Sequence, residues 1–244
     1  MTAVALVTGA TGAIGSAIVR RLAEDHVVVI GFHSSAHRAR ELADELGPEH
    51  DCVAVSVDDS ATLEAAAEWL AERHGRLDVL VNCAGVTEPV DHDDLDGLTD
   101  ALIDQIFTTN WRGPFATVRA MRRLLDVSDR AVVINISSVA GVTGQGSNVA
   151  YCASKAALDS MTRSLARALG PEIRVVSVSP GWVRGAYADR MPAGLLEAQE
   201  RATPLRRLAT PDDVAAAVHA TIVDLWFTTG VAIPVDGGRP LGAA

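Results

Sequence analysis

The sequence has 244 residues, of which 48% are hydrophobic, and it carries 21 basic against 31 acidic residues for a net charge of −10. A chain of this length is expected to form one α/β domain with a sizeable core. The negative charge repels polyanions, so nucleic acid and anionic membrane surfaces are excluded as general partners.

The cysteines and the hydropathy bear on the compartment. Cys52, Cys83 and Cys152 form an odd, sparse set without a Cys-x-x-Cys pair, which argues against a disulfide framework. The chain enters an apolar run at once without a basic leader, and no apolar stretch approaches the roughly 20 residues that span a bilayer. We therefore expect a cytoplasmic protein. The histidines are scattered without metal-ligand spacing, so no metal is expected.

Short apolar runs alternate with amphipathic helical segments along the whole chain. Continuous apolar runs of this kind are typical of strands buried on both faces of a parallel sheet, and the alternation predicts right-handed crossovers between them. The predicted strands are AVALV (3–7), VVVIGF (27–32), CVAVSV (52–57), LDVLVN (77–82), AVVINI (131–136), IRVVSVS (173–179) and a seventh that ends at 236–238.

A glycine-rich loop follows the first strand. The letters TGATGAIG stand between that strand and an amphipathic helical segment. Glycines allow the backbone to turn tightly and to approach a pyrophosphate, whose charge then lies at the helix N-terminus. An ordinary glycine turn is the alternative, but the position between strand and helix favours a phosphate loop. The candidate cofactor residues here are Thr8, Gly9, Thr11, Gly12, Ala13, Ile14 and Gly15.

A hydroxyl, a phenol and an ammonium group come together in the stretch 138–155. Tyr151 and Lys155 are four residues apart at the start of a helical segment, so they share one face. A fixed ammonium favours the phenolate and lowers the pKa of the phenol from its usual value of about 10. Ser138 ends an apolar run and can fold back across a glycine-rich loop. These groups suit proton transfer at a carbonyl or alcohol oxygen, although a Tyr-x-x-x-Lys pair alone can also be surface decoration.

With this serine, an upstream Asn110 and the glycine-rich start, the sequence resembles the short-chain dehydrogenase/reductase family over nearly its whole length. The resemblance implies a catalytic set of Ser138, Tyr151, Lys155 and Asn110. A helical segment at 98–125 should kink at Gly113-Pro114, and by analogy Asn110 holds a water there in a proton relay to Lys155.

The resemblance also sets the expected fold. It implies one Rossmann-type doubly wound α/β domain over residues 1–244, with a seven-stranded parallel sheet flanked by helices. The cofactor part covers about 1–135, and the catalytic and substrate part about 136–244.

The sequence departs from the family pattern in two places. The family carries TGxxxGxG, but Ala13 stands at the middle glycine and Gly12 precedes it; read as Gly9, Gly12 and Gly15, the loop fits the GxxGxxG spacing of extended members. Gly185 stands where the family has a threonine that contacts the nicotinamide amide, so anchoring of that group is expected to rest on backbone near Val183.

The end of the second predicted strand bears on cofactor choice. NAD-using members place an aspartate there, which binds the ribose hydroxyls and repels a 2′-phosphate. This chain has Phe32, followed by Ser34, Ser35, His37 and Arg38, which are available to a phosphate. We therefore expect NADP, with NAD as the alternative if Arg38 is only solvated helix surface.

Further cofactor contacts are transferred from the resemblance. Ser56 and Val57 are expected at the adenine edge, whereas Asp58 and Asp59 are interpreted as helix caps. NCAG at 82–85 resembles the NNAG turn of the family, in which the backbone, and not a side chain, lies beside the cofactor. Tyr151 and Lys155 are also expected to contact the cofactor, with Lys155 at the ribose hydroxyls. The remaining candidates are Asn82, Ala84, Gly85, Pro180, Gly181 and Val183.

The expected function is hydride transfer between NADP(H) and a carbonyl or secondary alcohol. The overall look is most similar to 3-oxoacyl-(acyl-carrier-protein) reductases, so the partner is a small-molecule substrate, free or carrier-linked. Residues 182–203 resemble a substrate lid, in which Arg184 either meets an anionic group or is solvated. A homotetramer or homodimer is expected. The alternatives are an NAD-dependent alcohol or sugar dehydrogenase and a non-catalytic NADP-binding regulatory module.

Overall fold

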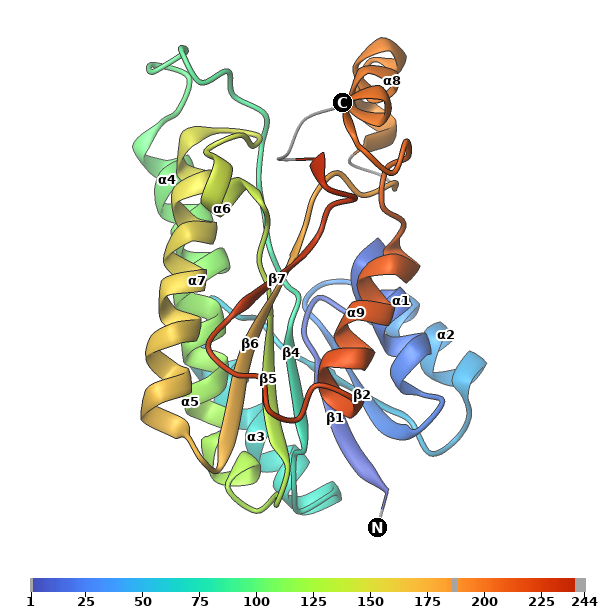
Figure 1. Cartoon of the computed structure of the whole chain (residues 1–244). Coiled ribbons are helices and arrows are strands. Elements are labelled where there is room, and N and C mark those ends of the chain that lie inside the picture. Colours follow the sequence, from blue (N-terminus) through green and yellow to red (C-terminus); the bar gives the residue numbers. More distant parts are fainter. Residues whose placement is uncertain (1, 186–187, 240–244) are drawn as a thin grey trace.

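A seven-stranded parallel sheet forms the centre of the protein (Figure 1). The computed structural model describes residues 2–185 and 188–239, so two residues of the expected lid lie outside the described part. The strand order is β3-β2-β1-β4-β5-β6-β7, which confirms the predicted fold class. The strands are β1 (Ala3–Val7), β2 (His26–Phe32), β3 (Asp51–Ala54), β4 (Val79–Asn82), β5 (Ala131–Ile136), β6 (Ile173–Pro180) and β7 (Ala232–Val235).

Helices cover both faces of this sheet and create two cores. Side chains alternate along each strand, so Ala5 and Val7 of β1 enter one core, whereas Val4 and Leu6 enter the other. This is why the strands are continuously apolar. The first core lies under α1 (Ala13–Leu22), α2 (Ala36–Leu46) and α9 (Pro211–Val223), and the second under α3 (Ser60–Arg73), α5 (Gly113–Leu125) and α7 (Val149–Leu169).

The predicted long helix at 98–125 is interrupted directly before Gly113. It consists of α4 (Asp100–Phe107), a π-helix (Thr108–Arg112) and α5. Gly113 is needed for close packing, because a Cβ there would lie 2.9 Å from the Cβ of Val57. The irregularity is a π-bulge, which is frequent at functional sites; it contains Asn110 and ends directly before Gly113-Pro114, where the kink was predicted.

The carboxyl ends of the strands meet at one edge of the sheet, at the top in Figure 1. The strand order reverses between β1 and β4, and ligands of doubly wound sheets bind outside such a switch point. The loops after β1, β4, β5 and β6 gather there. Two short elements also lie at this edge, α6 (Ala140–Thr143) and α8 (Ala193–Ala202).

Candidate active site

Two glycines give the loop after β1 its shape. Gly9 has a φ of +62°, and a Cβ there would lie 2.7 Å from the Cα of Ala84. A Cβ on Gly15 would lie 2.3 Å from the carbonyl oxygen of Gly9. On Gly12 the closest atom would be 3.4 Å away, an ordinary contact. Gly9 and Gly15 are therefore required sterically, whereas Gly12, at the start of α1, is not.

Thr8 ties this loop to the turn after β4. Its side chain is buried, and Oγ1 accepts hydrogen bonds from the backbone N–H groups of Cys83 and Ala84 at 3.1 and 3.2 Å. Its hydroxyl also donates to the carbonyl of Val81 at 3.4 Å. Thr8 thus acts on the loop geometry, and its hydroxyl is fully used within the protein.

The candidate residues for the 2′-phosphate lie at the start of α2. Phe32 is the last residue of β2 and packs partly on the first core. Ser34 and Arg38 are exposed, and Ser35 is the N-cap residue of α2. Arg38 lines a cleft of about 250 Å³ together with Thr11 of the glycine loop; its other lining residues are Ser16, Arg20, Glu41, Leu42 and Glu45.

The residues expected at the adenine edge follow β3, which ends sooner than predicted, at Ala54. The hydroxyl of Ser56 donates to Asp58 at 2.5 Å, and that bond lowers the pKa of the Asp58 carboxyl. Asp59 caps α3 by accepting from the N–H of Ala61, as predicted. Val57 is buried against Gly113.

Asn82 and Asn110 connect neighbouring elements through their amides. Asn82 ends β4 and donates to Oδ1 of Asn135 on β5 at 2.9 Å, so its side chain points along the sheet. Asn110 is fully buried in the π-helix. It accepts from the N–H of Val86 and donates to the carbonyl of Val86 and to Oγ of Ser154, at 2.9, 3.0 and 3.2 Å. The π-bulge thereby joins α7 to the chain after β4.

Lys155 and Asn110 face the same glycine. A Cβ on Gly85 would lie 3.3 Å from Oδ1 of Asn110 and 3.8 Å from Nζ of Lys155. Lys155 is 5% exposed and donates to the carbonyl of Ile136, the last residue of β5, at 2.8 Å. Burial lowers the pKa of this ammonium from 10.5 to about 8, and it raises that of the neighbouring Cys83 thiol to about 12. A thiol with so high a pKa stays neutral.

Tyr151 lies beside this ammonium, one turn earlier on α7. Nζ of Lys155 is 5.7 Å from the centroid of the Tyr151 ring, close enough for the charge to favour the phenolate. Ser138 follows β5, accepts from the N–H of Ala140 at 3.1 Å and donates weakly to the carbonyl of Pro180 at 3.4 Å. The loop after Ser138 packs onto α7 because Gly141 has no side chain, and a Cβ there would lie 2.7 Å from the nitrogen of Ala156.

Asn148 is a positioning residue that the sequence analysis missed. It is fully buried at the start of α7, and its Oδ1 caps the helix by accepting from the N–H of Tyr151 at 2.7 Å. Its Nδ2 donates to the carbonyl of Glu88 at 2.7 Å. An asparagine three residues before Tyr151 fits the helix-cap preference, which was the available signal.

The chain after β6 lies against the glycine loop. Gly181 approaches Asp236, whose Cβ would be 3.0 Å from a Cβ on Gly181. Val183 forms a parallel bridge with Ala209. Gly185 has a φ of +139°, and its Cβ would meet that of Ala13 at 3.4 Å. The two departures from the family pattern, Ala13 and Gly185, are therefore neighbours.

Arg184, expected to bind an anion or to be solvated, forms an ion pair with Glu200 of α8.

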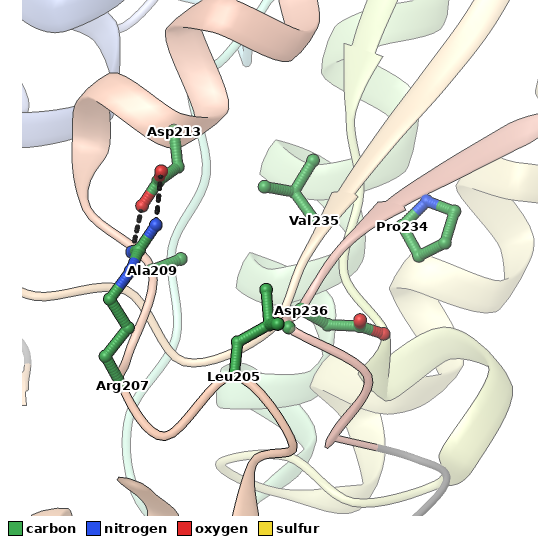
Figure 2. A pocket seen from close by; sticks show the side chains of 8 residues that line it. Leu205, Arg207, Ala209, Asp213, Pro234, Val235 and Asp236 are labelled. Atoms are coloured by element: carbon green, nitrogen blue, oxygen red, sulfur yellow. Dashed lines mark hydrogen bonds and ion pairs between the residues drawn. The ribbon is translucent and has the colours of Figure 1, made fainter.

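A second cleft of about 250 Å³ lies at the carboxyl end of β7 (Figure 2). Figure 2 shows Arg207 and Asp213 paired on one side of it and Val235 and Pro234 on the other. Arg207 donates to Asp213 through both terminal nitrogens, one at 2.8 Å, and holds the pKa of that carboxyl well below its usual range. The arginine and the carboxylate that line this cleft are paired with each other, and none of the four predicted catalytic residues lines it.

Comparison with known proteins identifies the class. A family model described as enoyl-(acyl carrier protein) reductase matches residues 9–239. The chain belongs to the short-chain dehydrogenase/reductase family, oxidoreductases that use a nicotinamide cofactor on hydroxyl and keto groups.

Two similar sequences and one similar structure illustrate what this chain resembles within that family. A protein proposed to be ketoacyl reductase 2 of the granaticin polyketide synthase from Streptomyces violaceoruber is 36% identical over 98% of this chain and 96% of its own. Galactitol 2-dehydrogenase from Agrobacterium fabrum is 32% identical over 97% and 96%. The structure of 3-ketoacyl-(acyl-carrier-protein) reductase from Brucella melitensis complexed with NADH has a TM-score of 0.88 at 29% identity, covering 97% and 98% of the two chains.

Within the described residues, no helix is long and apolar enough to cross a membrane, and no group of three or more His, Cys, Asp or Glu side chains is arranged to hold a metal ion.

Proposed function

We propose that this protein is an NADP(H)-dependent ketoreductase of the 3-oxoacyl type. The observation that carries the proposal is the pairing of Tyr151 with the buried Lys155 at the carboxyl edge of the sheet, next to the loop of Ser138. A phenol held beside a desolvated ammonium is a group prepared to give or take a proton near neutral pH.

The residues present fit a nicotinamide dinucleotide. Gly9 and Gly15 form a cradle that a Cβ would fill, and the N-terminus of α1 offers unpaired N–H groups to a pyrophosphate. Bound there, the cofactor supplies or accepts the hydride. Ser138 and Tyr151 hydrogen-bond the substrate oxygen, and Tyr151 delivers the proton in the reducing direction. Lys155 stabilises the phenolate, and Asn110 fixes the chain beside it and adjoins a relay to solvent.

The preference for NADP rests on the end of β2 and the start of α2. Phe32 provides no carboxylate to repel a 2′-phosphate, and Arg38 lines the same cleft as Thr11 without an ion-pair partner among the described residues. A 2′-phosphate there gains a charge-assisted hydrogen bond.

Substitution tests this preference directly. Phe32→Asp is expected to shift the ratio of NADPH to NADH activity toward NADH, and Arg38→Ala to weaken NADPH binding selectively. Arg40→Ala, an exposed arginine of the same helix outside that cleft, is the control. Unchanged ratios in both test variants would contradict the NADP assignment.

The reaction itself is tested with a panel of a 3-oxoacyl thioester, a β-keto ester, a cyclic ketone and a sugar alcohol. Tyr151→Phe removes the proton donor and is expected to lower kcat by about 10²–10⁴. Near wild-type turnover in that variant would refute the mechanism. Binding of NADPH without turnover of any substrate would favour a regulatory module instead.

The second candidate is an alcohol or sugar dehydrogenase, favoured by the similarity to galactitol 2-dehydrogenase. It uses the same residues in the oxidising direction, so the sugar alcohol in the panel separates the two. Turnover of the sugar alcohol at more than the rate of the thioester would select it.

We further propose that two copies associate through the π-helix and the start of α5. Trp111 and Phe115 expose 38% and 40% of their surface and stack on each other, with ring centroids 6.4 Å apart and planes 10° apart. Exposed paired aromatics beside the active-site helix suit a self-complementary contact.

A further inference from the structure

A buried carboxylate lies on α7 that the proposed reaction does not use. Asp159 is 5% exposed, and neither of its carboxylate oxygens has a hydrogen-bond partner among the described residues. A buried charge without hydrogen bonds is costly, so such groups are rare unless another charge compensates them.

The compensating charge is one helical turn away. Residues four apart on a helix have their Cβ atoms about 5–6 Å apart, which places Asp159 next to Lys155. The chain contains twenty arginines but this single lysine. The pair is farther apart than an ion pair of 4.0 Å, since none is found between them in the described part. Their interaction is therefore a field effect through the protein interior, where screening is weak.

The backbone register places a further polar group near Asp159. Thr162 of α7 and Ser177 of β6 are hydrogen-bonded at 2.8 Å. Ser179 lies two residues further along β6 on the same face, about 6.6 Å nearer the carboxyl edge of the sheet than Ser177. On α7, Asp159 lies about 4.5 Å nearer to that edge than Thr162. Ser179 is 4% exposed and its hydroxyl also lacks a partner among the described residues. A polar region thus lies behind the catalytic groups.

Three titratable groups surround the Lys155 ammonium. Tyr151 and Asp159 come from its own helix, and the neutral thiol of Cys83 comes from the turn after β4. The π-helix contributes the amide of Asn110, and β5 contributes the carbonyl of Ile136; neither titrates. Asp159 is the one carboxylate that acts on Lys155 in the described part of the chain.

We propose that Asp159 is a positioning residue that keeps Lys155 in its ammonium form inside the buried active site. The proposal deepens the proposed function and rests on it for its catalytic consequence. Burial opposes the charge on Lys155. Cys83 could support that charge only as a thiolate, and its raised pKa keeps it a neutral thiol, so the carboxylate of Asp159 is the group that supports it. Without the carboxylate, Lys155 loses its proton at a lower pH, and Tyr151 then loses the charge that favours its phenolate.

The single lysine allows a direct test. Lysine enriched with carbon-13 at Cε gives one resonance, and its titration in the intact protein reports the pKa of Lys155 without any substrate. In Asp159→Asn we expect this pKa to fall by about one unit, the size of effect that a nearby opposite charge produces. Asp159→Glu, which keeps the charge, should stay close to wild type.

The control removes a carboxylate of the same size from the surface. Asp104 is exposed on α4, a helix that packs against α7, and Asp104→Asn should leave the Lys155 titration unchanged. If Asp159→Asn does not fold, Asp159→Val removes the charge at similar volume and carries the same expectation. An unchanged or raised Lys155 pKa in the neutral variants, or an equal fall in Asp159→Glu, would overturn the proposal.

The pH profile of kcat links the group to the reaction. Its alkaline limb should move to lower pH in Asp159→Asn by the same amount as the lysine titration, with KM little affected. A shifted lysine titration with an unshifted profile would overturn the catalytic part. If the wild type turns over no carbonyl substrate, the proposed function fails while the carbon-13 titration still decides the charge effect.

Discussion

Asn148 offers the sharpest test of how the active-site helix is held. Its amide makes two good hydrogen bonds from a fully buried position, one to the N–H of Tyr151 and one to the carbonyl of Glu88. In Asn148→Ala the helix cap is lost, which costs about 1 kcal/mol. The carbonyl of Glu88 also loses its donor, and a hydrogen bond of this kind contributes about 0.5–1.5 kcal/mol. We expect a total of about 2 kcal/mol.

Thermal unfolding measures this loss. For a domain of this size, a loss of about 2 kcal/mol corresponds to a fall in Tm of about 4–8 °C. The matched control is Thr99→Ala, which removes an exposed cap from α4 whose hydroxyl accepts from Leu102 at 3.3 Å, and should cost at most about 1 kcal/mol. If Asn148→Ala melts no lower than Thr99→Ala, the cap does not fix the start of α7 as argued. Activity should fall together with stability, because Tyr151 is the residue whose backbone Asn148 holds.

Three further outcomes are expected. The pKa of Lys155 is lowered from 10.5 to about 8. Between these values the folded protein binds fewer protons than the unfolded chain, so wild-type stability rises with pH there by about 3 kcal/mol. Lys155→Met lacks this titration, so its free energy of unfolding relative to that of the wild type should fall by the same amount from pH 8 to pH 10.5, and a pH-independent difference would contradict the assignment. Gly15→Ala should abolish NADPH binding through its 2.3 Å backbone clash, whereas Gly12→Ala should retain it; equal affinities by fluorescence titration would count against the cradle. Phe115→Glu should convert the assembly to smaller species in light scattering, and an unaltered mass would place the interface elsewhere.

The fold was predictable because its strands are buried on both faces. The first strand at 3–7 matches β1 in both bounds, since every residue from Val4 to Val7 enters one of two cores. The third strand was predicted too long: the apolar letters continue to Val57, but pairing with β2 ends at Ala54. Hydrophobicity reports burial, and Val55 and Val57 are buried outside the ladder.

The site was predictable as a set of residue types and less so as a set of contacts. Tyr151, Lys155 and Asn110 lie together as expected. The pattern did not reveal that Thr8 is used up on the β4 turn, nor that the helix irregularity is a π-bulge. Such details depend on which distant backbone groups need partners, and that is decided by tertiary packing.

The bridge between Val183 and Ala209 has a consequence for how this protein can change. Arg184 donates to the carbonyl of Ala209 at 2.8 Å, and Ala209 donates to that of Trp182 at 3.0 Å. The two ends of the intervening segment are thus fastened to each other, and the closure entropy of a loop grows only slowly with its length. A change in the length of the chain between these two anchors should therefore cost little in closure entropy. Under the proposed function, this segment is where substrate range can vary while the cofactor loop is retained.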